Sequence, residues 1–133
     1  MHQKCHSVVR RSAVWMQLLP LVVLLAVFPV LVSLMWTFDR LVRLEFEKFP
    51  ENWTADGRPY PLLWTRRDMP RTIRSWLATQ RCALVWPFVV PEWSYQDAEA
   101  LRYARRLRVL FALWILVALP LFALSGIIAI VAS

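Results

Sequence analysis

The sequence predicts an all-α membrane protein in which two transmembrane helices are joined by a charged, partly helical loop that lies against the membrane. Of the 133 residues, 16 are Lys or Arg and nine are Asp or Glu, yet residues 13–38 and 109–133 contain none of them. As a helix rising ~1.5 Å per residue, either stretch exceeds the ~30 Å hydrocarbon thickness of a bilayer. With two glycines, two histidines and two cysteines, the chain has little material for phosphate loops, metal cages or disulfide frameworks.

Residues 1–12 are predicted to form a basic amino-terminal tail. Its His2, Cys5 and His6 place soft ligands near one another, but three residues at a frayed chain end make an incomplete metal site. We therefore predict neither a metal ion nor any other cofactor.

Residues 13–38 are predicted to form the first transmembrane helix. Trp15 and Trp36 are 21 residues apart, or about 31 Å along a helix. We expect one indole at each membrane interface, where its ring and its N–H group are both accommodated. The alternative is a cleaved signal peptide, but the apolar region of such a peptide has only ~7–15 residues and is followed by small residues. This stretch is longer and closes on Leu34-Met35-Trp36.

Residues 39–108 form the predicted loop domain, which carries 13 of the Lys and Arg residues and all nine acidic residues. Its first part is predicted to continue the first helix out of the bilayer, with Asp39 and Arg43 spaced for an i,i+4 pair, until Pro50 disfavours helix. Apolar residues recur there at helical spacing: Phe38, Leu41, Val42, Phe46 and Phe49.

The next segment, PENWTADGRPYPLLWTRRDMP, contains four prolines and the turn signal Asp56-Gly57. We expect an irregular connection here, followed by a helix with Pro70 at its first position. On that helix Ile73, Trp76, Leu77 and Leu84 share one face, and its flank carries Arg71, Arg74 and Arg81.

That pattern predicts a basic amphipathic helix lying on the membrane surface, although a helix packed on the rest of the loop would show a similar pattern. The following run, ALVWPFVV, is too short to span a bilayer. It is either an interfacial piece or the small core of the loop domain. Trp76 and Trp86 are predicted interface anchors in addition to Trp15 and Trp36.

Ser94 with Asp97 resembles a helix start, and this helix should run directly into the second transmembrane helix, residues 109–132. Four arginines precede the span: Arg102, Arg105, Arg106 and Arg108. Like charges at this spacing destabilise a helix unless an anionic layer neutralises them. We predict that this collar, together with Arg71, Arg74 and Arg81, contacts lipid headgroups. The alternative is an ordinary positive-inside topogenic signal.

Within the spans, Pro20, Pro29 and Pro120 should each bend or loosen the helix locally. Three small residues spaced by four would let another helix approach closely: Ser125, Ala129 and Ser133.

Positive charge near the span ends predicts the orientation of the chain. The amino-terminal tail offers Lys4, Arg10 and Arg11, whereas the loop offers eight cations: Arg40, Arg43, Lys48, Arg58, Arg102, Arg105, Arg106 and Arg108. The loop is therefore predicted to face the cytoplasm with both termini outside. Cys82 would then be reduced, without a disulfide to Cys5.

No histidine occurs in the loop, and its carboxylates are interspersed with arginines, so we expect intraloop ion pairs on the surface and not catalysis. Nucleic acid is not predicted as a partner, because the net charge of the loop is small and both its ends are tethered. No small-molecule substrate is identified from the sequence.

The two terminal spans, the extension FDRLVRLEFEKFP, the Asp-Gly turn, the tripeptide Leu84-Val85-Trp86 and the run DAEALRYARRLR together resemble bacterial universal stress protein B and related small inner-membrane proteins. The resemblance implies a bacterial inner-membrane protein linked to general stress, with no known reaction.

The function predicted from these observations is non-enzymatic: a stress-related or accessory subunit whose basic loop associates with anionic lipid and with a protein partner or a second copy. The alternative is a holin-like or toxin-like protein that permeabilises the membrane. A transporter is disfavoured because neither span contains an ionisable residue.

Overall fold

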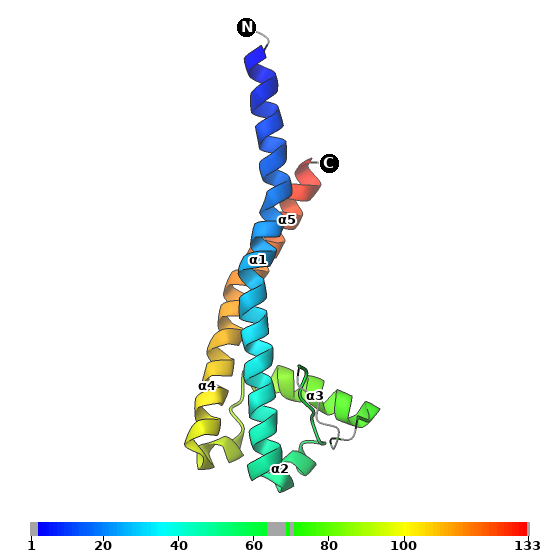
Figure 1. The fold of residues 1–133 in the computed structure, drawn as a ribbon, viewed down its shortest axis with the longest axis vertical. Helices are drawn as coiled ribbons and strands as arrows, with labels where there is room; N and C mark the ends of the chain where they lie inside the picture. Colours follow the sequence, from blue (N-terminus) through cyan, green and yellow to red (C-terminus); the bar gives the residue numbers. More distant parts are fainter. Residues whose placement is uncertain (1–2, 64–68, 70, 133) are drawn as a thin grey trace. The chain divides into compact units, whose positions relative to one another are not determined.

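The computed structural model describes residues 3–63, 69 and 71–132, and every regular element in this part of the chain is helical. The predicted all-α class is therefore confirmed (Figure 1). In chain order the elements are α1 (Gln3–Lys48), α2 (Pro50–Ala55), α3 (Ile73–Val85), the 3-10 helix η1 (Glu92–Gln96), α4 (Ala98–Leu113), the π-helical turn η2 (Trp114–Ala118) and α5 (Leu119–Ala132).

The chain divides into two compact units. The first comprises Met1–Val30 and Leu113–Ser133, and the second comprises Leu31–Ala112. We call them the apolar unit and the loop unit. Two helical segments, Leu21–Lys48 and Ala98–Leu124, are long and apolar enough to cross a membrane. Their charge-free parts, up to Phe38 and from Val109, are the parts that we treat below as membrane-spanning.

In the apolar unit a small cluster of buried residues joins α1 to the second span. Val23 and Val27 of α1 pack with Ala118, and Trp114 and Leu121 lie around them. Many other apolar side chains of this unit are exposed, for example Leu25 at 65% and Leu116 at 72%. An apolar surface of this kind is expected of helices whose surroundings are hydrocarbon.

The prolines act differently in the two spans. α1 begins at Gln3, within the predicted tail, and stays helical through Pro20 and Pro29. In the second span the α-helix gives way to the π-helical turn η2, which ends two residues before Pro120. Pro120 has no N–H to donate to the carbonyl four residues earlier, at Leu116, and its ring crowds that oxygen. A widened turn at this point relieves the conflict.

The loop unit has its core where α4 runs antiparallel along α1 (Figure 1). Phe38, Leu41 and Val42 of α1 are buried here. They face a stripe on α4 whose members are also buried: Ala100, Ala104 and Leu107. The two alanines are 0% exposed, and their small side chains let the helix backbones approach closely.

α1 ends at Lys48, as Pro50 predicted, but Pro50 also begins a short helix, α2. The prediction of a wholly irregular connection was therefore wrong at residues 50–55. The fixed φ of proline suits the first position of a helix, where its missing N–H costs nothing. Trp53 of α2 is buried and donates its indole N–H to the carbonyl of Pro59 at 2.8 Å.

The Asp56-Gly57 turn is confirmed. Gly57 has φ +90° and Arg58 has φ +62°, both in the left-handed region. A Cβ added to Gly57 would lie 3.1 Å from the Cβ of Ala78 on α3. Glycine is therefore needed twice here, for the backbone conformation and for the close approach of α3.

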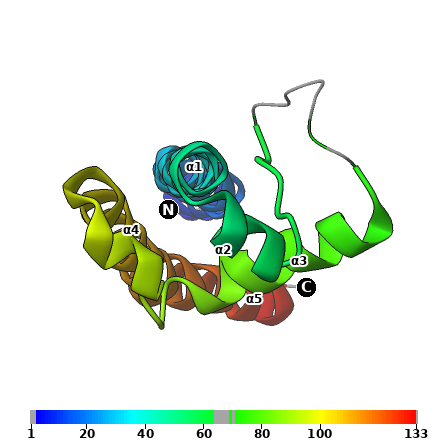
Figure 2. The same cartoon turned by 90° about the horizontal axis from the view of Figure 1, so that it is seen from below.

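α3 begins at Ile73, with Thr72 as its N-cap, and not at Pro70, which lies outside the described residues. The Thr72 hydroxyl oxygen accepts a hydrogen bond from the Ser75 N–H at 3.1 Å, which satisfies a helix-end donor. Within the loop unit α3 runs across α1 and not alongside it, and α2 lies beside α3 (Figures 1 and 2).

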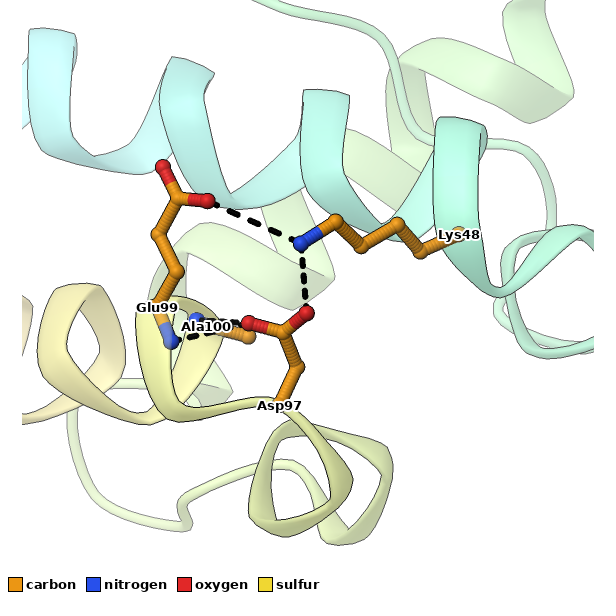
Figure 3. Close-up of polar contacts among 4 residues, drawn as sticks. All are labelled: Lys48, Asp97, Glu99 and Ala100. Atoms are coloured by element: carbon orange, nitrogen blue, oxygen red, sulfur yellow. Dashed lines mark hydrogen bonds and ion pairs between the residues drawn. The ribbon is translucent and has the colours of Figure 1, made fainter.

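A helix start near Ser94 and Asp97 is confirmed, but α4 begins at Ala98 with Asp97 as its cap, and Ser94 lies in η1. Oδ1 of Asp97 accepts the N–H groups of Glu99 at 2.8 Å and Ala100 at 3.1 Å (Figure 3). The Lys48 ammonium lies 2.5 Å from Oδ2 of Asp97 and 3.6 Å from a carboxylate oxygen of Glu99. The end of α1 is thereby tied to the beginning of α4, and the Lys48 ion pair lowers the pKa of Asp97.

Candidate membrane interface

The two sides of α3 are the reverse of those of an ordinary surface helix. Its inward side consists of small or polar residues, all buried: Ser75, Ala78, Thr79 and Cys82. Its outward side carries Ile73, Leu77 and Leu84, which are 82%, 56% and 62% exposed. A helix in water buries its apolar stripe, so the outward stripe of α3 is suited to an apolar neighbour.

Hydrogen bonds allow the inward side of α3 to be polar. The Thr79 hydroxyl donates to the Ser75 carbonyl at 2.9 Å and accepts the Tyr60 N–H at 2.9 Å. Polar groups that are buried with their partners in place cost little. Packing of α3 on the rest of the loop unit is therefore confirmed, and its apolar side is left outward, where the predicted contact with the membrane surface stays a prediction.

The arginines beside this apolar side are also outward. Arg71 and Arg74 are exposed, and so is Arg81, whose guanidinium forms an ion pair with Asp56 at 3.7 Å. Trp76 is 50% exposed, as an interface anchor would be. Their contact with lipid stays a prediction.

Trp86 was predicted as an interface anchor, and this is wrong. Its side chain is 4% exposed and packs between Phe38 and Trp93, with ring centroids 5.4 Å and 6.0 Å away. The segment ALVWPFVV therefore contributes Trp86 to the core of the loop unit, because α3 ends at Val85 and the chain turns inward. Phe88 and Val89 from the same segment stay 60% and 62% exposed.

The turn after α3 is held against α4 at the start of the second charge-free stretch. The Arg108 guanidinium donates to the carbonyls of Pro87 at 3.3 Å and Phe88 at 2.6 Å. The rings of Phe88 and Phe111 meet edge to face at 5.3 Å. The exposed apolar turn and the beginning of the span therefore lie side by side.

The other collar residues, Arg102, Arg105 and Arg106, are exposed on α4. Arg106 lies over Trp36, with its Cζ 5.9 Å from the ring centroid. Trp36 is 41% exposed and has a second guanidinium, that of Arg40, 5.2 Å away. The sequence analysis predicted Trp36 as an interface anchor, which stays a prediction, and missed Arg40 as its partner, although their i,i+4 spacing was a usable signal.

The side chains of the three small residues predicted to pack against another helix, and of one predicted interface anchor, fall outside the described part of the chain. The side chains of Ser125 and Ala129, that of Trp15, and the whole of Ser133 lie outside what the structure describes.

Among the carboxylates, the predicted surface ion pairs are confirmed for Asp56, Asp97 and Glu99. The prediction is wrong for Glu45, which is 0% exposed. Neither of its carboxyl oxygens has a hydrogen-bond partner among the described residues, and the same holds for the indole N–H of Trp93. Burial, reinforced by the neighbouring Asp56 carboxylate, raises the pKa of Glu45 to about 9. Glu45 follows the charge-free stretch and belongs to the loop unit.

Within the described residues, no group of three or more His, Cys, Asp or Glu side chains is placed to hold a metal ion. The side chains of His2, Cys5 and His6 lie outside that part. No family model, curated protein or solved structure matches this chain. The resemblance to universal stress protein B thus stays a prediction from the sequence.

Proposed function

We propose that this chain is a non-enzymatic integral protein of the bacterial inner membrane, whose loop unit rests on anionic lipid at the cytoplasmic surface. The observation that supports this most is the reversed α3, which buries Ser75 and Thr79 but leaves Ile73 82% exposed. The two charge-free helical stretches supply the anchors, and α3 runs across α1 as an interfacial helix would (Figure 1).

The energetics favour lipid as the neighbour of this face. Removing a Leu or Ile side chain fully from water is worth about 1.5–3 kcal/mol, and α3 offers three such residues beside a turn with Phe88 and Val89 exposed. A basic residue near an anionic surface gains on the order of 1 kcal/mol. The outward arginines of α3 and α4 therefore strengthen the same attachment.

The biological role that we propose is that of an accessory or scaffolding subunit. The loop unit, held at the surface by lipid, would present its remaining exposed side to a protein partner or a second copy, in adaptation of the envelope to stress. The link to stress follows from the resemblance described above.

Site-directed spin labelling tests the lipid contact. In a Cys5→Ser background, Ile73→Cys places a nitroxide on the apolar side of α3. Glu51→Cys places one on the exposed first turn of α2 as the matched control. The full-length protein is reconstituted in nanodiscs with one third phosphatidylglycerol, and accessibility to oxygen and to a water-soluble nickel chelate is measured.

We expect the label at position 73 to be accessible to oxygen and shielded from the nickel chelate, and the label at position 51 to show the reverse. Nickel accessibility at position 73 would contradict the proposal, because α3 would then face water. Shielding from both reagents would also contradict it, because protein and not lipid would cover the helix.

A further inference from the structure

An open cavity of about 130 Å³ lies beside Trp36, lined by Trp36, Asp39, Arg40, Arg43 and Leu63. We call it the Trp36 site. Two guanidiniums from different helices stand near its indole: Arg40 of α1 at 5.2 Å and Arg106 of α4 at 5.9 Å from the ring centroid. The cavity shares no lining residue with the outward stripe of α3. Arg106 does not line the cavity itself but lies against the same indole, and it belongs to the collar that is predicted to contact headgroups.

The charges at the site favour an anion. Among the described residues that line the cavity, Asp39 is the only carboxylate. Its two oxygens accept the N–H groups of Leu62 at 2.5 Å and Leu63 at 2.6 Å. It thus fixes the connecting segment against α1. Within the described part of the chain, neither Arg40 nor Arg106 forms an ion pair with a carboxylate.

The indole also prepares the guanidiniums for a ligand. A guanidinium held over an aromatic ring loses part of its freedom before it binds, and its N–H edge stays available. That edge matches two oxygens of a phosphate at once. A volume of 130 Å³ would hold roughly four waters at ~30 Å³ each, which leaves room for a phosphate group and its ester oxygens.

The position of the site decides which phosphate it meets. Trp36 precedes the end of the first charge-free stretch by two residues, and Arg106 precedes Val109, the start of the second, by three. Phe38, where the first stretch ends, and Val109, where the second begins, both belong to the loop unit. If these stretches cross the bilayer, the site lies at the level of the headgroups, and the acyl chains would follow the apolar helices.

We propose that the Trp36 site binds the phosphate of an anionic phospholipid, held by Arg40 and Arg106 beside the Trp36 indole. The inference rests on the proposed function, because only a membrane-embedded chain brings a lipid to this level. Inorganic phosphate shares the chemistry of the headgroup but lacks the acyl chains.

Native mass spectrometry of the full-length protein in a mild detergent tests the proposal. Dioleoyl phosphatidylglycerol, dioleoyl phosphatidylcholine and inorganic phosphate are titrated separately. The test variant combines Arg40→Gln with Arg106→Gln. The matched control combines Arg102→Gln with Arg105→Gln, which removes the same charge from exposed collar positions that share the diffuse attraction to headgroups but take no part in the Trp36 site. Thermal melts without lipid check that both variants are folded, and Arg40→Lys serves as a milder variant.

We expect the parent protein to bind one phosphatidylglycerol tightly. The affinity for this lipid should fall at least tenfold in the test variant and less than twofold in the control, and Arg40→Lys should give an intermediate affinity. Equal weakening in both double variants would overturn the proposal, since the attraction would then be diffuse. Equal affinity for phosphatidylcholine would also overturn it, as would displacement of the lipid by millimolar inorganic phosphate. The spin label at position 73, measured in the test variant, separates the two ideas: it stays lipid-facing if only the Trp36 site is wrong.

Discussion

Glu45 is a carboxylic acid enclosed in the apolar core of the loop unit, and its surroundings decide its protonation. It follows Leu41 by four residues and Val42 by three, so helical spacing points it to the same side as these buried residues. The sequence analysis placed Glu45 on the surface because carboxylates are usually exposed. Its helical spacing from Leu41 and Val42 would have predicted the burial correctly. A neutral acid costs much less to bury than a carboxylate.

The raised pKa of Glu45 predicts a pH dependence of stability. Its pKa is about 9 in the folded protein and 4.5 ordinarily, so the folded state binds the extra proton between these values. The contribution of Glu45 to the free energy of unfolding should therefore be largest near pH 5 and fall as the pH rises toward 9, by at most ~1.4 kcal/mol per pH unit.

Glu45→Gln, which mimics the neutral acid, should flatten this decline. Chemical unfolding in detergent at pH 6, 7.5 and 9 measures it. Glu51→Gln, the same change at an exposed position of α2, should leave the slope as in the parent protein. An unchanged slope in Glu45→Gln would show that Glu45 does not cause it.

Cys82 is a free thiol that is 2% exposed. Burial, with the nearby Asp56 and Glu45 carboxyls, raises its pKa to about 12. Since the thiolate is the reactive form, we expect maleimide labelling at pH 7.5 to be slower on the order of a hundredfold or more than at an exposed cysteine. In Cys5→Ser, Glu51→Cys protein, one equivalent should react at once and the second only after denaturation. Rapid reaction of both would mean that α3 opens readily from the loop unit.

At the scale of elements, local chemistry predicted most of the boundaries. Asp97 caps α4 and the Asp56-Gly57 turn is present, because these residue types satisfy or adopt what a helix start or a turn demands. α2 was missed because proline both disfavours helix before it and favours helix after it. The start of α3 was placed too early because Thr72 competes with Pro70 as a start signal, and the Thr72 cap satisfies a backbone donor.

The turn between α2 and α3 gives a test at this scale. Gly57→Ala should lower the free energy of unfolding by roughly 1–2 kcal/mol, since an alanine is strained at φ +90° and its Cβ would press on Ala78 at 3.1 Å. Gly126→Ala is the matched control, because an added Cβ there meets nothing within 4 Å. Equal effects of the two substitutions in thermal or chemical unfolding would contradict this account of the turn.

For the whole molecule, the sequence predicted two long apolar helices, and the structure contains them. The sequence alone could not predict which side of α3 faces inward. Hydrophobic periodicity finds the two sides of a helix, but the rule that the apolar side is buried assumes water outside. Trp86 was misplaced for a related reason, since an indole suits a core as well as a headgroup layer.

The orientation across the membrane is testable as a whole-molecule property. Eight loop cations against three in the tail predict that the carboxyl terminus faces away from the cytoplasm. An alkaline phosphatase fused after Ser133 should therefore be active in cells, and green fluorescent protein fused at the same point should be dark. A fluorescent fusion with inactive phosphatase would reverse the orientation.

The core of the loop unit depends on two helices that are far apart in the chain. Phe38, Leu41 and Val42 of α1 have their packing partners, Ala100, Ala104 and Leu107, on α4. During synthesis α3 leaves the ribosome before α4, at a time when this core cannot yet close. If α3 contacts lipid as proposed, its outward apolar side would attach the incomplete loop to the bilayer before this core forms. We therefore expect the membrane to act first as a template for assembly of the loop unit, and only afterwards as its support.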